Sequence, residues 1–301
     1  ILDNIEKMPE SILFWRSMTQ WIGGMGIIVL TIAILPLLGV GGMELFASET
    51  PGPTKDKIHP RIKETAKRLW VIYISLTLTE TILLWLADMP LFDAINHALT
   101  NVSTGGFSTK QESIGHFTSP LIQYIIIIFM FIGGINFTML YFAAKLKFRK
   151  FIENDEFKWF IFSIPILLLI IFPLVLQVSG NNIETSFRQA LFQIMSIITG
   201  TGYSNADFTT WGAFSSFVFF LLMFSGASSG STTGGVKIVR IGLLIKNIIL
   251  EFKRKLHPNA IIPVQLNGSA VSSKIIYNLL AFVFFYLFIF VLGSIILTFI
   301  G

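Results

Sequence analysis

The chain has 301 residues, of which 53% are hydrophobic and 13% are charged, and its mean hydropathy is +0.73. Soluble domains contain roughly 45–50% apolar and about 25% charged residues, so this composition excludes two ordinary soluble domains and indicates a membrane protein. The absence of cysteine excludes disulfides, thiolate metal sites and a cysteine nucleophile. The net charge of +5 can be interpreted only from where the Lys and Arg residues lie along the chain, because membrane proteins place these residues according to topology.

Six apolar runs are long enough to cross about 30 Å of hydrocarbon, for which a helix needs roughly 20 residues. They cover residues 21–40, 69–87, 120–144, 159–178, 211–250 with an interruption, and 275–300. No basic leader with a cleavage site precedes the first run, which predicts no signal peptide. The start at Ile1 suggests that a segment of the protein preceding this chain is missing from the sequence.

Lys and Arg are concentrated in three alternate connections, at residues 41–68, 145–158 and 237–274. The exceptions are Lys7, Arg16, Lys110 and Arg188. The positive-inside rule therefore predicts that the three basic connections lie in the cytoplasm and that both ends of the chain lie outside.

Two connections on the outer side each contain a short helical pattern. Residues 90–108 open with Pro90 and Asp93, and residues 182–204 open with Asn182 and Glu184, which are typical of helix starts. Each pattern runs for about 12 residues, which is too short to span a bilayer. We therefore expect two re-entrant helices.

The two segments repeat one another at an offset of 96 residues, which aligns Ala94 with Ala190 and Gly106 with Gly202. The predicted fold is an all-α polytopic membrane protein built of helix, re-entrant pore helix and helix units. The predicted segments are a closing half-repeat at 1–46, a cytoplasmic loop at 47–68, a second repeat at 69–147, a third repeat at 158–254, and the first helix of a fourth repeat at 275–301.

The short helices each end in a tail rich in Gly, Ser and Thr, at residues 102–107 and 198–203. Irregular backbone at membrane depth is tolerated only where it is buried or lines a watery cavity. Glycine lets consecutive carbonyls turn inward and replace the hydration shell of a monovalent cation. The candidate filter residues are Val102, Ser103, Thr104, Gly105, Gly106, Ile198, Thr199, Gly200, Thr201 and Gly202. Carbonyls alone do not decide between potassium and sodium.

Residues 225–235 interrupt the fifth apolar run with glycines and hydroxyl residues, so we expect the helix to break there and the loop to face the pore below the filter. The candidate gate residues are Gly226, Ser228, Ser229, Gly230, Ser231, Thr232, Thr233, Gly234 and Gly235. The segment does not match the motif of a phosphate-binding P-loop, because Val236 separates the last glycine from Lys237 and no strand is expected before the segment. A small-residue packing surface is the alternative.

Other polar and small residues carry less specific signals. Close helix packing is the preferred interpretation of Gly23-Gly24-x-Gly26 and of Gly133-Gly134. Asn136 fits either a pore-lining residue or an interhelical hydrogen bond. The four histidines, His59, His97, His116 and His257, have no metal-binding spacing.

The motifs together resemble those of the Trk/Ktr/HKT superfamily of potassium transporters, and most closely its bacterial TrkH-type membrane subunit. The matching segments are residues 14–29, 101–107, 199–203 and 230–237. The resemblance implies a four-repeat ion pore with pseudo-fourfold symmetry, filter glycines at Gly106 and Gly202, and an intramembrane gating loop in the third repeat. It further implies a homodimer in the bacterial inner membrane, with TrkA-like nucleotide-binding regulatory subunits on the cytoplasmic side.

In the family, the first-repeat filter distinguishes potassium from sodium preference, and the helix after the fourth filter carries a pore-facing basic residue. Neither position has a match in this sequence, so we expect 301 residues to be the middle of a longer protein.

The predicted function is potassium uptake through a carbonyl-lined filter gated by an intramembrane loop. The expected ligand is K⁺ as the transported ion, with membrane lipid around the protein, no cofactor, no nucleic acid and no catalytic residues. A sodium or mixed-cation transporter of the same architecture is the alternative. A polytopic membrane enzyme would need a polar catalytic cluster that is not found, and a purely structural scaffold leaves the repeated tails unexplained.

Overall fold

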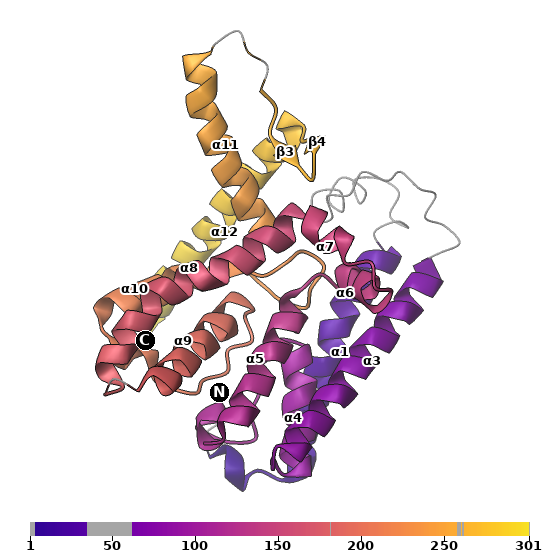
Figure 1. Ribbon diagram of the computed structural model, residues 1–301, viewed down its shortest axis with the longest axis vertical. Helices are drawn as coiled ribbons and strands as arrows, with labels where there is room; N and C mark the ends of the chain where they lie inside the picture. The colour runs from indigo at the N-terminus through magenta and orange to yellow at the C-terminus, as the bar shows by residue number, and fades with distance from the viewer. Residues whose placement is uncertain (1–3, 35–61, 181, 258–259, 261, 301) are drawn as a thin grey trace.

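The computed structural model describes residues 4–34, 62–180, 182–257, 260 and 262–300, and it is almost entirely helical (Figure 1). The elements in chain order are η1 (Ile5–Lys7), α1 (Glu10–Ile34), α3 (Ile62–Leu86), α4 (Leu91–Val102), η2 (Ser113–His116), α5 (Pro120–Gly134), α6 (Phe137–Ala144), α7 (Arg149–Glu153), α8 (Asp155–Val178), α9 (Ile183–Ile198), η3 (Phe208–Trp211), α10 (Ala213–Leu222), β1 (Ser225–Gly226), β2 (Val236–Lys237), α11 (Ile238–Leu256), β3 (Gln265–Leu266), β4 (Ser269–Ala270) and α12 (Ser273–Ile300).

Within the described residues, three of the six apolar runs form helices long and apolar enough to cross a membrane. These spans are Lys67–Leu86, Asp155–Val178 and Ser273–Ile300, and the bent pair α5 and α6 counts as a fourth if it is taken as one span. The first run lies in α1, which begins at Glu10 rather than near residue 21 because Pro9 supplies the first carbonyl acceptor of the helix. The rest of that run and most of the predicted loop at 47–68 lie outside the described residues.

The apolar run at residues 120–144 does not form one continuous helix. The axis turns by 107° between α5 and α6. The Gly133-Gly134 pair weakens the helix, Ile135 adopts an extended conformation, and Asn136 caps the next helix by accepting a hydrogen bond from the Thr138 amide. The freed carbonyl of Gly134 accepts a hydrogen bond from the Ser228 amide, so another segment satisfies the broken backbone.

The two short helices are present where the sequence predicts them. The helix α4 has 12 residues and packs against α1, α3 and α5, whereas α9 has 16 residues and packs against α5, α8 and α10. In Figure 1, α4 runs beside α3 and α9 runs beside α8, so each repeat places its short helix against its own first spanning helix.

The interruption of the fifth apolar run is also present as predicted. The helix α10 ends at Leu222 and α11 begins at Ile238, and between them β1 and β2 pair in parallel with Ser225 opposite Val236. This pairing closes the intervening residues into a loop. We call residues 225–235 the intramembrane loop.

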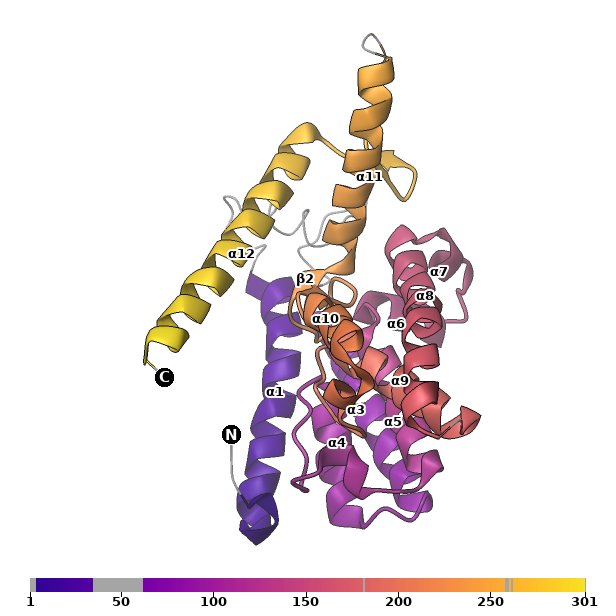
Figure 2. The ribbon, with the colours of Figure 1, turned by 90° about the vertical axis from the view of Figure 1, so that its left-hand side faces the viewer.

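The last part of the chain extends away from the helical bundle (Figure 2). The helix α12 packs on α11, and Phe290 on α12 contacts the rings of Phe220 and Phe224. Only 6% of its apolar window is buried within the described residues. A long apolar helix with so little protein around it suits a lipid environment.

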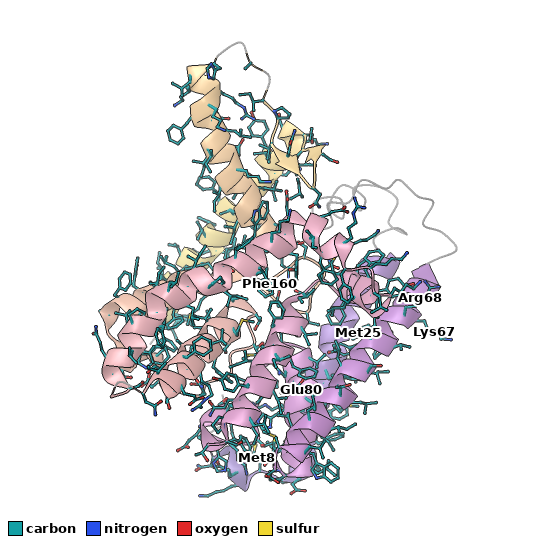
Figure 3. All side chains as sticks on the ribbon, in the orientation of Figure 1. Met8, Met25, Lys67, Arg68, Glu80 and Phe160 are labelled. Atoms are coloured by element: carbon teal, nitrogen blue, oxygen red, sulfur yellow. The ribbon has the colours of Figure 1, made fainter. Side chains whose placement is uncertain are left out.

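The basic segments gather toward one end of the molecule. Figures 1 and 2 place the start of α3, the helix α7 and the far end of α11 toward the upper end, whereas α1 begins at the lower end. Figure 3 shows Lys67 and Arg68 at the upper end of α3, while Met25, Glu80 and Phe160 lie inside the bundle. This distribution supports the cytoplasmic assignment of that end.

Close packing explains only part of the glycine cluster on α1. A Cβ on Gly24 would lie 2.8 Å from the Ser103 Cβ and 2.9 Å from the Tyr73 hydroxyl, so Gly24 lets α1 approach the 102–107 tail. Among the described residues, a methyl group on Gly23 or Gly26 would meet no atom within 4 Å, which does not support the packing prediction for these two. In the second pair both glycines are closely packed, because a Cβ on Gly133 would lie 3.3 Å from Thr104 and one on Gly134 would lie 3.0 Å from both Phe160 and Thr199.

The α1 glycines generate a stability prediction. We expect Gly24→Ala to lower the thermal stability of the full-length protein in detergent by about 1–3 kcal/mol, because the methyl group overpacks the contact with Ser103. The control Gly23→Ala, one residue away on the same helix, should be neutral or stabilising, since its methyl group meets no atom and alanine favours helix. Equal melting temperatures for the two variants would contradict the packing role of Gly24.

Candidate functional site

The two tails adopt the same backbone conformation at equivalent positions. Ser103 and Thr199 both have φ −82°, after which φ is positive at Thr104 (+52°) and Gly106 (+64°) in one tail. In the other tail φ is positive at Gly200 (+66°) and Gly202 (+81°). The residues between, Gly105 and Thr201, are not left-handed. Alternating handedness of this kind turns successive peptide groups the same way, with N–H groups on one side and carbonyls on the other.

The N–H groups of both tails point back to the helices that precede them. The amides of Gly105 and Gly106 donate to the Thr100 carbonyl at 2.7 and 3.2 Å. In the second tail, the Gly202 amide donates to the Ser196 carbonyl at 3.2 Å and the Gly200 amide to the carbonyl of Ile197. These hydrogen bonds satisfy the last carbonyls of each short helix. The carbonyls of the tail itself then point away from the helix.

The middle carbonyls of each tail have no hydrogen-bond donor within the described residues. Among the described residues, the carbonyls at positions 104–106 and 199–202 accept no hydrogen bond from protein. Backbone carbonyls inside a protein are almost always paired. Two matched rows of free carbonyls at membrane depth are therefore suited to bind a dehydrated cation.

Side chains of the short helices tether the tails at equivalent places. The Thr100 hydroxyl donates to the Phe107 carbonyl at 2.7 Å, and the Ser196 hydroxyl donates to the Tyr203 carbonyl at 2.6 Å. The sequence analysis did not select these hydroxyls. The same 96-residue offset relates them and could have identified them.

A second pair of tethers lies one turn earlier on the same helices. His97 Nδ1–H donates to the Asp93 carbonyl, and its Nε2 is hydrogen-bonded to the Ser108 hydroxyl at 2.9 Å. The equivalent Gln193 donates to the Ser204 hydroxyl at 3.3 Å. His97 is thus a buried, hydrogen-bonded residue rather than a metal ligand. Within the described part of the chain, no group of three or more His, Asp or Glu side chains could hold a metal ion.

The two tails lie next to each other. A Cβ on Gly106 would collide with the Thr201 carbonyl oxygen, so only glycine allows this approach. The Tyr203 hydroxyl bonds across the boundary to the Thr100 hydroxyl at 2.7 Å and to the His97 carbonyl at 3.1 Å. The structure therefore brings both predicted filter segments to one place, as neighbouring walls.

The intramembrane loop contacts both tails. The Thr232 hydroxyl lies 3.2 Å from the Val102 carbonyl and 3.2 Å from the Thr104 hydroxyl. In the other tail, a Cβ on Gly200 would lie 3.9 Å from the Gly234 nitrogen. The predicted proximity of loop and tails is therefore observed.

Other residues of the loop anchor it rather than approach the tails. The Ser229 amide donates to a carboxylate oxygen of Glu156 at 2.5 Å, and the Ser229 carbonyl accepts from the Asn136 side chain at 2.6 Å. The Phe137 amide donates to the Gly230 carbonyl at 3.0 Å. Asn136 thus makes an interhelical hydrogen bond, the second of its two expected roles. The sequence analysis missed Glu156, since nothing local marks it as a partner of the loop.

The remaining candidate gate residues form contacts within the loop. The hydroxyls of Ser231 and Thr233 share a hydrogen bond of 2.8 Å, and the Lys237 ammonium donates to the Thr233 hydroxyl at 2.9 Å and to its carbonyl. Gly226 lies against the Gly234 carbonyl, where a Cβ would not fit. Gly230 and Gly235 have φ of +69° and +73°. Glycine is therefore required for the fold of the loop itself.

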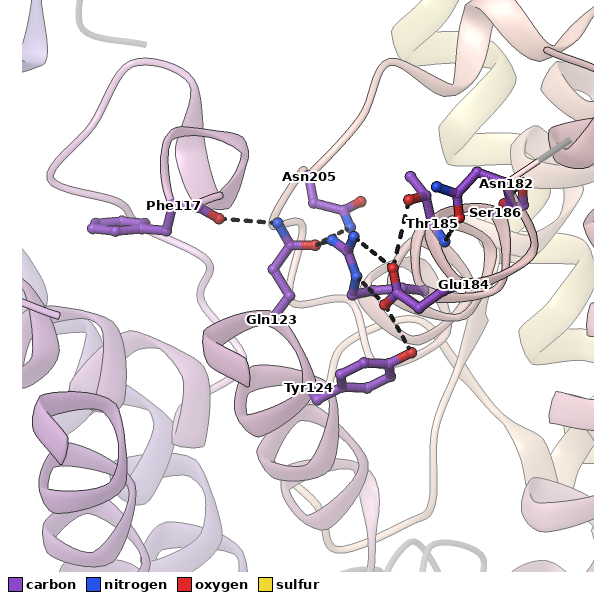
Figure 4. A network of polar contacts seen from close by, with 9 residues as sticks. Phe117, Gln123, Tyr124, Asn182, Glu184, Thr185, Ser186 and Asn205 are labelled. Atoms are coloured by element: carbon purple, nitrogen blue, oxygen red, sulfur yellow. Dashed lines mark hydrogen bonds and ion pairs between the residues drawn. The ribbon is translucent and has the colours of Figure 1, made fainter. Parts of the chain in front are cut away.

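Charged groups surround the outer ends of the short helices, and the Arg16 guanidinium lies 4.1 Å from the ring centroid of Phe107 at the end of the first tail. Arg188 joins two repeats, because its guanidinium lies 2.5 Å from the Gln123 side-chain oxygen on α5 and 2.8 Å from a Glu184 oxygen. Figure 4 shows Gln123 and Glu184 on their two helices, with Tyr124 and Asn205 close by. Asp93 bonds the Thr109 hydroxyl at 2.6 Å and lies 3.7 Å from the Lys110 ammonium. The side-chain and backbone hydrogen bonds from Thr209 lower the pKa of the exposed Asp207 carboxyl, just beyond the second tail.

Comparison with known proteins identifies relatives over nearly the whole chain. The model of the TrkH family, described as a cation transport protein, matches residues 1–299. The Trk system potassium uptake protein TrkH of Salmonella typhimurium is 42% identical over 296 residues, which cover 97% of this chain and 61% of that protein. The Escherichia coli potassium uptake protein TrkG is 34% identical over 288 residues, or 95% of this chain and 59% of that protein.

A solved structure has the same fold. The crystal structure of the potassium transporter TrkH from Vibrio parahaemolyticus superposes with a TM-score of 0.84 at 39% identity, covering 97% of this chain and 60% of that one. The all-α polytopic fold predicted from the sequence is thereby confirmed. The chain spans about three fifths of the length of the relatives that it matches.

The anchoring of the intramembrane loop can be tested by amide exchange. Asn136→Asp keeps the cap on Thr138 but removes the hydrogen bond donated to Ser229. Since a hydrogen bond contributes about 1 kcal/mol, we expect amide exchange in residues 228–231 to rise roughly five- to tenfold, measured by mass spectrometry. Asn182→Asp is the control, because Asn182 caps α9 through its side-chain oxygen. Unchanged exchange in the Asn136 variant would refute the anchor.

Proposed function

We propose, because this chain belongs to the TrkH family of cation transport proteins, that it forms part of a potassium uptake pathway across the bacterial inner membrane. The observation that carries the proposal is the matched pair of tails at residues 102–107 and 198–203. The amides of Gly105, Gly106, Gly200 and Gly202 are bonded to the preceding helices, and the carbonyls at 104–106 and 199–202 accept no hydrogen bond from the described residues. K⁺ is the transported ion and needs no resident cofactor. The relatives are named as potassium uptake proteins, which supports transport rather than an enzymatic reaction.

The mechanism follows from the geometry of the backbone. A potassium ion that enters from the side of Asp207 exchanges hydration water for the carbonyls of the two tails. Each short helix directs the negative end of its dipole toward the tail that follows it. Because the oxygens are fixed by hydrogen bonds on the opposite edge of the backbone, they are already placed before the ion arrives.

The intramembrane loop is the proposed gate. It lies against Val102 and Thr104 of one tail and approaches Gly200 of the other, so it occupies the cytoplasmic side of both carbonyl rows. The glycine-rich backbone and the separable anchors at Asn136 and Glu156 allow it to move without unfolding α10 or α11.

The cytoplasmic end carries the proposed partner surfaces. The last turn of α11 contains Lys253, Arg254 and Lys255, and the α11 helix projects beyond the bundle (Figure 2). This exposed basic end supports docking of TrkA-like nucleotide-binding regulatory subunits beneath the membrane. The long lipid-facing or partner-facing surface of α12 supports a homodimer in which two such chains share one regulatory ring.

The filter is tested by uptake in a potassium-transport-deficient bacterium that expresses the complete gene. We expect Gly106→Ala and Gly202→Ala to lower potassium uptake by about tenfold or more, because a left-handed conformation costs an L-residue roughly 1–2 kcal/mol and the Gly106 methyl group collides with Thr201. Gly180→Ala is the matched control, with φ +63° and open space but a position far from the tails. Normal uptake with both filter glycines replaced would refute the assignment.

The gate is tested by shortening the loop. Deletion of residues 231–234 should raise potassium flux in reconstituted vesicles several-fold, because the segment that contacts the tails is removed while the anchors at Ser229 and Gly230 remain. The same vesicles give the sodium flux, so the measurement also separates a potassium pathway from a mixed-cation pathway. Unchanged flux through a folded deletion variant would show that the loop does not gate.

A further inference from the structure

Glu80 is a carboxyl residue that the proposed transport mechanism does not use. It lies on α3 in the interior of the bundle (Figure 3) and is 0% exposed. No Lys, Arg or His among the described residues forms an ion pair with it. A buried carboxylate without an ion-pair partner is strongly unfavourable, which favours the neutral, protonated form of Glu80.

The partner of Glu80 is Asn101, the penultimate residue of α4. The Asn101 amide nitrogen donates to Glu80 Oε1 at 2.6 Å and to the Ile126 carbonyl on α5 at 3.2 Å, so both of its hydrogens are used. Two oxygens of the same pair remain, Glu80 Oε2 and Asn101 Oδ1. Both are buried without a hydrogen-bond partner.

One proton satisfies both oxygens. A carboxylic acid has a donor and an acceptor side by side, and a primary amide has the complementary acceptor and donor. If Glu80 Oε2 carries the proton and donates to Asn101 Oδ1, the two side chains form a reciprocal pair and every polar atom of the pair is bonded. An ionised Glu80 would leave Asn101 Oδ1 unpaired and a negative charge buried.

The pair lies directly behind a tail. The Asn101 carbonyl accepts the Thr104 amide at 2.8 Å, and Thr104 is the residue at which the 102–107 tail first turns left-handed. The orientation of Asn101 therefore sets where the free carbonyls of this tail begin. The residue of α9 that is equivalent to Asn101 is Ile197, which cannot form such a polar pair. The pair therefore supports only the 102–107 tail.

We propose that Glu80 is protonated in the folded protein and acts, through its reciprocal pair with Asn101, as a positioning residue for the 102–107 tail. The neutral acid locks the last turn of α4 between α3 and α5 without placing a charge behind the ion path. The positioning role rests on the proposed function of the tails, whereas the protonation state does not.

The matched variants are Glu80→Gln and Glu80→Ala in the full-length protein. Glutamine reproduces the acid, with an oxygen that accepts from Asn101 and an amide that donates to it, whereas alanine leaves Asn101 unpaired. We expect the glutamine variant to keep uptake and the preference for K⁺ over Rb⁺ and Na⁺ within about twofold, and the alanine variant to lose about tenfold in preference. A glutamine variant as impaired as alanine would show that a charge is required, which overturns the proposal.

Infrared spectroscopy tests the proton independently of transport. The carbonyl-stretch band of a protonated carboxylic acid should be present in the wild type at neutral pH and lose one component in Glu80→Gln. Since the two proteins differ at one position, the lost component belongs to Glu80. No lost component would overturn the protonation even if the alanine variant failed to fold. A lost component with unchanged ion preference in a folded alanine variant would overturn the positioning role alone.

Discussion

Backbone hydrogen bonding inside a membrane is the constraint on which this structure depends. Each tail leaves its helix and still satisfies its N–H groups, because those groups turn back to the last carbonyls of the helix, as Gly106 does to Thr100 and Gly202 does to Ser196. The alternation of φ that makes this possible turns the carbonyls at 104–106 and 199–202 to the opposite edge, where no protein donor within the described residues reaches them. A cation can bind these carbonyl oxygens, which then replace its hydration shell.

The two broken helices satisfy one another. The break after Gly134 frees carbonyl and amide groups at the end of α5 and the start of α6, and the interrupted run between α10 and α11 frees others. The Gly134 carbonyl accepts from Ser228 and the Phe137 amide donates to Gly230, so each break supplies partners for the other. Two helix interruptions in different repeats therefore form one structural unit beneath the tails.

Local sequence predicted the re-entrant helices and the conformation of the tails, because helix length, glycine content and the 96-residue offset are all local signals. Local sequence failed to predict features whose conformation depends on a contact with a residue far along the chain. The turn of 107° between α5 and α6 needs the loop at residues 225–235 to accept the broken backbone. In the same way, Gly24 is close-packed and Gly23 is not, since only one of them faces Ser103.

The sequence by itself determined the membrane solvent, the order of spanning and re-entrant helices, and the two tails whose glycines permit left-handed backbone. Only the tertiary structure decided that the tails are neighbours joined through Tyr203, that Asn136 and Glu156 hold the intramembrane loop, and that Glu80 faces Asn101. The physical reason is that periodicity and conformational preference act between nearby residues. Hydrogen bonds between residues such as Glu156 and Ser229 depend on how the repeats pack, which no local pattern records.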